Sequence, residues 1–146
     1  MTIEPISYEN AVWSSVIEYA EKCSWKAGPF LAKYMRECSF SDWEKVFLAR
    51  ENGNIVGYCT LAKTDCIPDV AYTPYIGYMF VGEPYRGKRV SQKLIQCALK
   101  YAKNLKFSKV YLVSGEQGLY EKYGFVKIEE RKDLWGEDEQ IFAISI

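Results

Sequence analysis

The chain has 146 residues, of which 49% are hydrophobic and 16% aromatic, and its 19 basic and 19 acidic residues cancel. This size and composition indicate one globular domain over residues 1–146 with a substantial core, and they exclude a disordered chain. The neutral balance also argues against a non-specific nucleic-acid binder, which would show a basic excess.

The first half of the chain alternates strand-like and helical segments. TIEPIS, residues 2–7, has strand-like alternation, and residues 8–22 carry an apolar stripe that predicts a helix. A shorter stripe over residues 30–38 predicts a second helix, with Gly28-Pro29 marking its start. Residues 45–63 are expected to form a hairpin, because Asn52-Gly53 favours a tight turn between two β-rich runs. Residues 64–74 have the composition of a loop.

The second half contains a strand-helix-strand unit. The aromatic run YIGYMFVG, residues 75–82, predicts a strand, and the apolar stripe from Val90 to Leu105 predicts a helix. SKVYLVSG has the character of a buried strand, so the 81–115 segment is expected to be a right-handed crossover between parallel strands. A short helix ended by Gly124 then precedes two final strands. The order predicts an α/β fold (α+β in some schemes) with a mixed, mostly antiparallel sheet.

A basic stretch, VGEPYRGKRVSQKL, lies where the helix of this unit begins. Arg86, Lys88 and Arg89 crowd its first turn, and Lys93 follows. A helix N-terminus is positive, so each close cation is unfavourable by roughly 0.3–1 kcal/mol. A bound phosphate or pyrophosphate would reverse this effect, because it accepts hydrogen bonds from the free N–H groups of the first turn. We interpret the stretch as an anion site; the alternative is a turn whose basic side chains extend into water. The chain has neither GxxxxGK[ST] nor GxGxxG, which disfavours a nucleoside-triphosphate site.

Two motifs in the chain resemble the GNAT family of acyl-CoA-dependent N-acyltransferases. The first is similar to the family's acetyl-CoA pyrophosphate loop and is carried by Val81, Arg86, Gly87, Lys88, Val90 and Leu94. The second, LYEKYGF at 119–125, is similar to the family's segment near the thioester, and the order of elements matches over nearly the whole chain. The resemblance implies a GNAT-like fold and direct transfer of an acetyl group from acetyl-CoA, as co-substrate and without a metal, to an amine.

The resemblance also assigns roles to residues. It places the pyrophosphate at Arg86, Gly87, Lys88, Arg89, Val90 and Ser91, and a backbone N–H for the thioester oxygen around Phe80 and Val81. Arg89 stands where the family usually has glycine, and Ser91 where it usually has glycine or alanine. By its position in the second motif, Tyr120 matches the family's general acid. A phenol suits this role, because it is protonated at neutral pH and can protonate a thiolate. Tyr123 is the alternative three residues on.

The acceptor side is less defined by the sequence. The chain has no histidine, so a general base would be a carboxylate, a tyrosine, a lysine, a cysteine, a backbone group or water. The candidates that stay open are Asp65, Glu83, Glu116, Tyr75 and Tyr78. Trp25, Tyr72, Tyr75 and Tyr78 are expected to line the acceptor pocket, with Asp65 or Glu116 close to the acyl end.

Other features bound the function. Five cysteines without CxxC spacing, and no histidine, argue against a zinc site or a disulfide framework. With no signal-like apolar run, we expect a soluble, cytoplasmic protein that binds neither membrane nor nucleic acid. The expected function is N-acetylation of a small-molecule or peptide amine, with a homodimer left open. The alternative is a non-catalytic acyl-CoA sensor or interaction module of the same fold.

Overall fold

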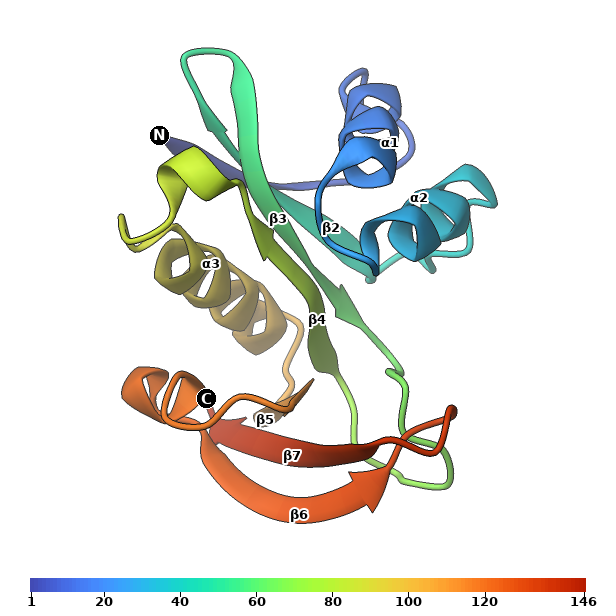
Figure 1. Cartoon of the computed structure of the whole chain (residues 1–146), viewed down its shortest axis with the longest axis vertical. Helices are drawn as coiled ribbons and strands as arrows, with labels where there is room; N and C mark the ends of the chain where they lie inside the picture. The colour runs from blue at the N-terminus through green and yellow to red at the C-terminus, as the bar shows by residue number, and fades with distance from the viewer.

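A seven-stranded sheet in the order β1-β2-β3-β4-β5-β7-β6 forms the centre of the protein, seen here in a computed structural model that describes residues 1–146 (Figure 1). The helices and strands are β1 (Thr2–Ile6), α1 (Trp13–Lys22), α2 (Gly28–Arg36), β2 (Lys45–Glu51), β3 (Asn54–Ala62), β4 (Tyr75–Val81), η1 (Glu83–Tyr85), α3 (Val90–Asn104), β5 (Lys109–Ser114), η2 (Tyr120–Tyr123), β6 (Val126–Lys132) and β7 (Asp138–Ser145). Only β4 and β5 pair in parallel, and the other neighbours are antiparallel. The predicted mixed, mostly antiparallel sheet is therefore confirmed.

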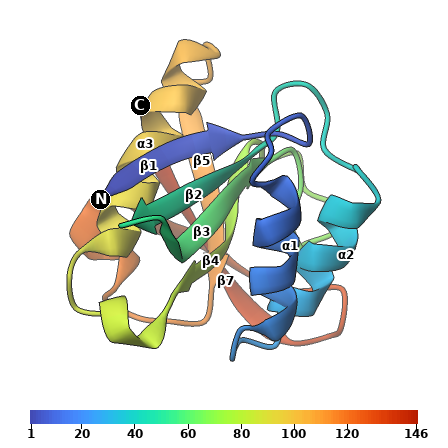
Figure 2. The ribbon, with the colours of Figure 1, turned by 90° about the horizontal axis from the view of Figure 1, so that it is seen from above.

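Helices cover both faces of the sheet. Helix α3 packs on one face, and α1 and α2 pack on the other (Figure 2). The α3 side contains the buried side chains of Leu94, Ile95 and Ala98, and the α1/α2 side contains those of Val16 and Leu31. Burying a Leu, Ile or Val side chain contributes about 1.5–3 kcal/mol, so each face holds its helices chiefly through apolar contact.

Local sequence explains most element boundaries. Asn52 and Gly53 have φ angles of 52° and 80°, which the tight turn between β2 and β3 requires, so the predicted hairpin is confirmed. The first helix begins at Trp13 rather than near residue 8, because Asn10 closes a turn. Its Oδ1 accepts a hydrogen bond of 2.8 Å from the N–H of Ser7, and its N–H donates to the Ser7 carbonyl at 3.0 Å.

None of the helices is both long and apolar enough to span a lipid bilayer.

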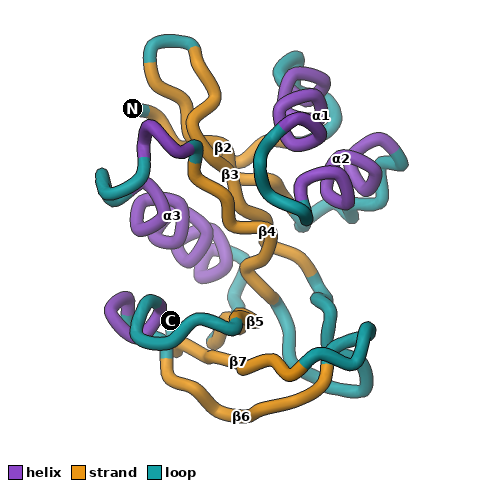
Figure 3. The backbone as a smooth tube through the Cα atoms, in the orientation of Figure 1, coloured by secondary structure: helices purple, strands orange, loops and turns teal.

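Strands β4 and β5 touch over a very short length. Their register covers only Tyr75 with Tyr111 and Ile76 with Leu112, and beyond this point the two strands diverge (Figure 3). Strand β4 stays paired with β3 as far as Val81, with an extra residue near Tyr78, whose φ is 48°. The N–H groups of β4 that face β5 after Ile76 therefore have no strand partner. The sheet is split at its centre, between its two helical layers.

A glycine brings α1 and α2 close together, which gives a stability prediction. A Cβ on Gly28 would lie 2.2 Å from the carbonyl oxygen of Ala20 and 2.5 Å from Sγ of Cys23. Gly28→Ala should therefore lower the free energy of unfolding, measured in urea, by about 1–3 kcal/mol. Gly115→Ala is the matched control, because no atom lies within 4 Å of its Cβ position. Equal stability of the two variants would contradict the tight contact between α1 and α2.

Candidate active site

The turn between η1 and α3 presents a row of free backbone donors. Gly87 and Arg89 both have left-handed φ angles, of 78° and 63°. The backbone N–H groups of residues 87–92 donate to no acceptor within the chain; the first helical bond runs from the Lys93 N–H to the Arg89 carbonyl, at 3.1 Å. Helix α3 has no side-chain cap. This combination gives a set of free N–H donors at a helix N-terminus, the kind of arrangement that binds phosphate.

The same turn is positively charged and lacks counter-ions. Arg86, Lys88, Arg89 and Lys93 are exposed, and none takes part in an ion pair. They add to the positive end of the α3 dipole, so the turn is electrostatically unfavourable until an anion binds. The neutral chain thus carries a local positive site directly after β4.

Arg86 and Arg89 occupy different positions in this turn. The Nε–H of Arg86 donates to the Val81 carbonyl at 2.9 Å, and its guanidinium lies 5.7 Å from the centroid of the Phe80 ring. This contact fixes the turn to the end of β4 and leaves the two outer nitrogens of Arg86 without a partner. Arg89 is the N-cap residue of α3 and adopts a left-handed conformation that costs a non-glycine residue about 1–3 kcal/mol. The backbone conformation explains why glycine suits this position, and it shows that arginine can adopt it.

Tyr120 lies on the α3 side of the split. It begins η2, which ends at Gly124 with a φ of 96°, and its ring packs against Phe125 and Phe142. The residue is only 8% exposed, and its hydroxyl donates to no acceptor within the chain. Burial, and secondarily the negative charge of Glu116, raise the pKa of Tyr120 to about 12. The phenol is therefore protonated at neutral pH and free to donate.

Tyr123 faces a different part of the site from Tyr120. Its hydroxyl lies 3.2 Å from Oγ of Ser91, in the first turn of α3. The structure thus places Tyr123 beside the row of free N–H groups, and it brings the two sequence motifs into direct contact.

The α1/α2 side of the split is lined by aromatic side chains. Trp25, from the connection between α1 and α2, stacks on Phe80 with ring centroids 6.3 Å apart and contacts Tyr78 edge-on at 6.1 Å. An open groove of about 530 Å³ between α1 and the tip of the β2–β3 hairpin reaches Phe80 from the same side. Tyr75, the first residue of β4, and Asp65, whose carboxylate lies against Gly77 of that strand, are on this side as well. Four of the sequence-predicted acceptor residues, Trp25, Asp65, Tyr75 and Tyr78, therefore share one face of the sheet.

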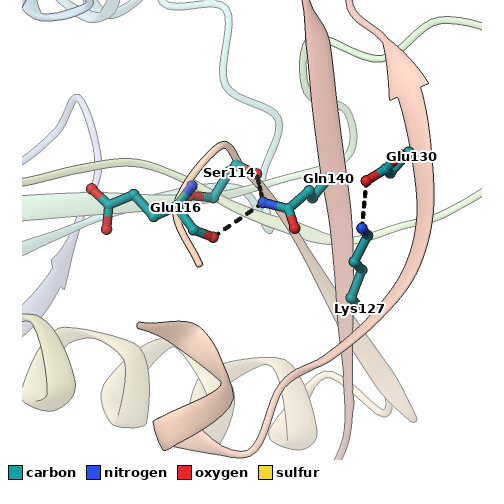
Figure 4. Close-up of polar contacts among 5 residues, drawn as sticks. All are labelled: Ser114, Glu116, Lys127, Glu130 and Gln140. Carbon is teal, nitrogen blue, oxygen red and sulfur yellow. Dashed lines mark hydrogen bonds and ion pairs between the residues drawn. The ribbon is translucent and has the colours of Figure 1, made fainter. Parts of the chain in front are cut away.

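Glu116 is placed apart from this acceptor group. The side-chain amide of Gln140 donates to the carbonyls of Ser114 and Glu116, at 3.2 and 3.1 Å, and fixes the chain where it leaves β5 (Figure 4). The Glu116 carboxylate extends away from Gln140, and its charge acts on Tyr120 instead (Figure 4). Figure 4 also shows an ion pair between Lys127 and Glu130, both on the edge strand β6. No motif marked Gln140, because its role depends on the pairing of β5 with β7.

The cysteines and acidic groups do not form a metal centre or a disulfide. All five cysteines are free, and no three cysteine, aspartate or glutamate side chains lie together as metal ligands would. Cys59 is buried in the α3-side core, and burial raises the pKa of its thiol. A thiol in this environment is unsuited to act as a nucleophile.

Several solved structures share the fold. A GNAT family acetyltransferase from Elizabethkingia anophelis with acetyl-CoA bound is 19% identical, with a TM-score of 0.69 and coverage of 99% of this chain and 97% of that chain. An aminoglycoside 6'-N-acetyltransferase complexed with coenzyme A is 14% identical, with a TM-score of 0.72 and coverage of 99% and 97%. An IAA acetyltransferase from Bacillus cereus ATCC 14579 is 23% identical, with a TM-score of 0.65 and coverage of 99% of both chains. At these identities the likeness shows the fold alone.

The family follows from the sequence match. No curated protein matches the chain. The model of the acetyltransferase (GNAT) family, however, matches residues 11–125, which include the split strands, the basic turn and Tyr120. The chain belongs to the acetyltransferase (GNAT) family.

Proposed function

We propose that the protein transfers the acetyl group of acetyl-CoA directly to a primary amine of a small molecule or peptide. The observation that carries this proposal is the row of free N–H groups at residues 87–92, surrounded by unpaired cations and placed beside the split between β4 and β5. Acetyl-CoA or coenzyme A is bound in two solved structures of the same fold, which supports the choice of donor.

The residues of the turn fit the chemistry of coenzyme A. A pyrophosphate needs hydrogen-bond donors and positive charge, and residues 87–92 supply N–H groups while Lys88, Arg89 and Lys93 supply charge. Gly87 has no atom within 4 Å of its Cβ position, so the turn is open on that side. Acetyl-CoA would supply the thioester when bound, and the chain would supply its orientation.

Strand β4 and Tyr120 would serve the two ends of the reaction. A β4 N–H that faces the split would bind the oxygen of the carbonyl as negative charge develops there; its assignment to Phe80 or Val81 stays a prediction. When the C–N bond forms and the C–S bond breaks, the Tyr120 hydroxyl would give its proton to the departing sulfur. We propose direct attack by the amine rather than an acyl-cysteine intermediate, because Cys59, the cysteine within electrostatic reach of Tyr120, is buried.

Tyr120→Phe tests the acid. Removal of the hydroxyl should lower kcat about 10²- to 10⁴-fold, the usual contribution of a positioned acid, with little change in the affinity for acetyl-CoA. The assay is thiol release with a panel of primary amines. Tyr123→Phe is the control, because it removes a neighbouring hydroxyl that contacts Ser91 instead, and it should keep most of kcat. Full turnover by Tyr120→Phe would show that another group protonates the sulfur.

Arg89→Gly tests the pyrophosphate turn. Glycine fits the left-handed φ better, but the change removes a charge, so we expect acetyl-CoA to bind about 3- to 10-fold more weakly, equivalent to about 0.7–1.4 kcal/mol. Calorimetry should also show a weaker dependence of binding on salt. Lys100→Ala, on an exposed part of the same helix, should leave binding unchanged. Tighter binding by Arg89→Gly would mean that the arginine obstructs the phosphates.

Thiol release also separates this proposal from the alternative of a non-catalytic acyl-CoA sensor. An enzyme should release thiol with at least one amine of the panel, whereas a sensor would bind acetyl-CoA and turn over none.

A further inference from the structure

Asp65 lies directly against the backbone of β4 at the point where the strand leaves β5. Its Oδ2 is 2.7 Å from the position that a Cβ on Gly77 would occupy, and Oγ1 of Thr60 is 3.4 Å from the same point. Gly77 immediately follows Ile76, the last β4 residue paired with β5. The missing side chain of Gly77 therefore provides the space in which the carboxylate sits, at the start of the split.

The carboxylate has no positive partner. The backbone N–H of Cys66 donates to Oδ1 at 2.6 Å, and neither carboxylate oxygen joins an ion pair with a Lys or Arg of the chain. Burial raises the pKa of Asp65, and the hydrogen bonds from Cys66 oppose this only in part. A half-buried carboxylate without a cation beside it is unfavourable in the folded state, and such groups are typical of functional sites.

A buried polar group without a partner lies on the same strand, within electrostatic reach of Asp65. Tyr75 precedes Gly77 by two residues and so shares its face of β4. Tyr75 is 2% exposed and its hydroxyl has no hydrogen-bond partner, which is rare for a buried polar atom. Burial, and then the charge of Asp65, raise the pKa of Tyr75 to about 12. An unpaired phenol is therefore within electrostatic reach of Asp65.

The groups around Asp65 favour a cation as its ligand. Those within electrostatic reach are Tyr75 and Tyr78 on β4, Cys66 on the same loop, and Glu139 on β7. None is positive. Burial, together with the charges of Asp133 and Asp65, raises the pKa of Glu139 as well. The region thus repels further negative charge and attracts an ammonium ion.

We propose that Asp65 receives the acceptor as an ammonium ion and takes the proton that must leave before the amine can attack. The inference rests on the acetyltransferase function proposed above and assigns its general base. The ammonium transfers one proton to Oδ2 of Asp65, and the freed lone pair forms the C–N bond as the C–S bond breaks. Sulfur takes the proton of Tyr120, the tyrosinate regains a proton lost from the new amide nitrogen, and Asp65 releases its proton to water. One proton is released per turnover.

The placement of the other carboxylates agrees with this choice. Glu116 acts on Tyr120, on the α3 side, where a proton is given rather than taken. Glu83 lies in η1, exposed and beyond the end of β4. Asp65 lies on the α1/α2 side instead. Its carboxylate and the Thr60 hydroxyl approach the same point beside Gly77, and Thr60 shares the face of Tyr58, which packs in the α1/α2 layer. The proton is therefore taken from one side of the split and given from the other.

Asp65→Asn tests the base with two kinds of acceptor. The asparagine keeps an oxygen for the Cys66 N–H but cannot take a proton. We expect kcat/KM for an alkyl primary amine to fall about 10²-fold or more. For hydroxylamine, which is largely unprotonated at neutral pH, the loss should be only several-fold. A structural role would lower both rates equally, so equal losses, or no loss, would overturn the inference.

The thermal stability of Asp65→Asn gives an independent readout. A raised pKa in the folded state means that the native protein loses stability as pH rises from the unfolded pKa of Asp, about 3.9, through the folded value, and the loss persists above it. Asp65→Asn should therefore have a Tm at neutral pH at or above that of the wild type. Glu44→Gln is the control: Glu44 is buried and its carboxylate accepts the N–H groups of Ser41 and Lys63, so the Tm of this variant should fall.

The outcomes separate the inference from the proposed function. Wild-type turnover with a low Tm for Asp65→Asn would overturn the inference and leave the acetyltransferase function in place. Absence of thiol release by the wild type with every amine would overturn both. Selective loss of the alkyl amine rate, with the Tm kept or raised, is the result that we expect.

Discussion

The structure depends on one short contact, the two-residue parallel pairing of β4 with β5. Longer pairing would close the sheet and use the β4 N–H groups in a ladder. The two-residue pairing holds the two halves of the sheet together at Tyr75 and Ile76, and the strands diverge after Ile76. The divergence places unpaired backbone donors at the centre of the molecule, where groups on either face of the sheet can reach one bound molecule. Gly77 and the extra residue near Tyr78 lie at the start of this divergence.

Charge is distributed unevenly across the split, although the chain as a whole is neutral. Unpaired cations surround the α3 N-terminus, while Asp65 and Glu139 remain without cations on the acceptor side. Each set is unfavourable alone, since one adds to a positive dipole and the other loses hydration. An anionic donor and a cationic acceptor would relieve both. Under the proposed function, the energy of the site would improve when both substrates bind.

Much of this arrangement was predictable from the sequence, because it depends on local signals. Asn52-Gly53 marked the hairpin, and the basic turn and LYEKYGF marked two segments that the structure brings into contact through Ser91 and Tyr123. The position of Asp65 was not predictable, because it depends on a glycine twelve residues away and on the register of β3 with β4. The separation of Glu116 from the acceptor side was not predictable either, because it depends on a hydrogen bond from Gln140, which lies 24 residues further along the sequence in β7. The left-handed φ of Arg89 could not be predicted from the sequence, because arginine rarely adopts this conformation.

A crystal structure of the protein with acetyl-CoA would show whether the basic turn and the split in the sheet together hold the donor. We expect the pyrophosphate to accept hydrogen bonds from the N–H groups of residues 87–92, and the thioester to lie between the diverging parts of β4 and β5. In that position it would face the Tyr120 hydroxyl on one side and the Asp65 carboxylate on the other. Binding of acetyl-CoA away from the turn, or closure of the split by further pairing of β4 with β5, would contradict the account.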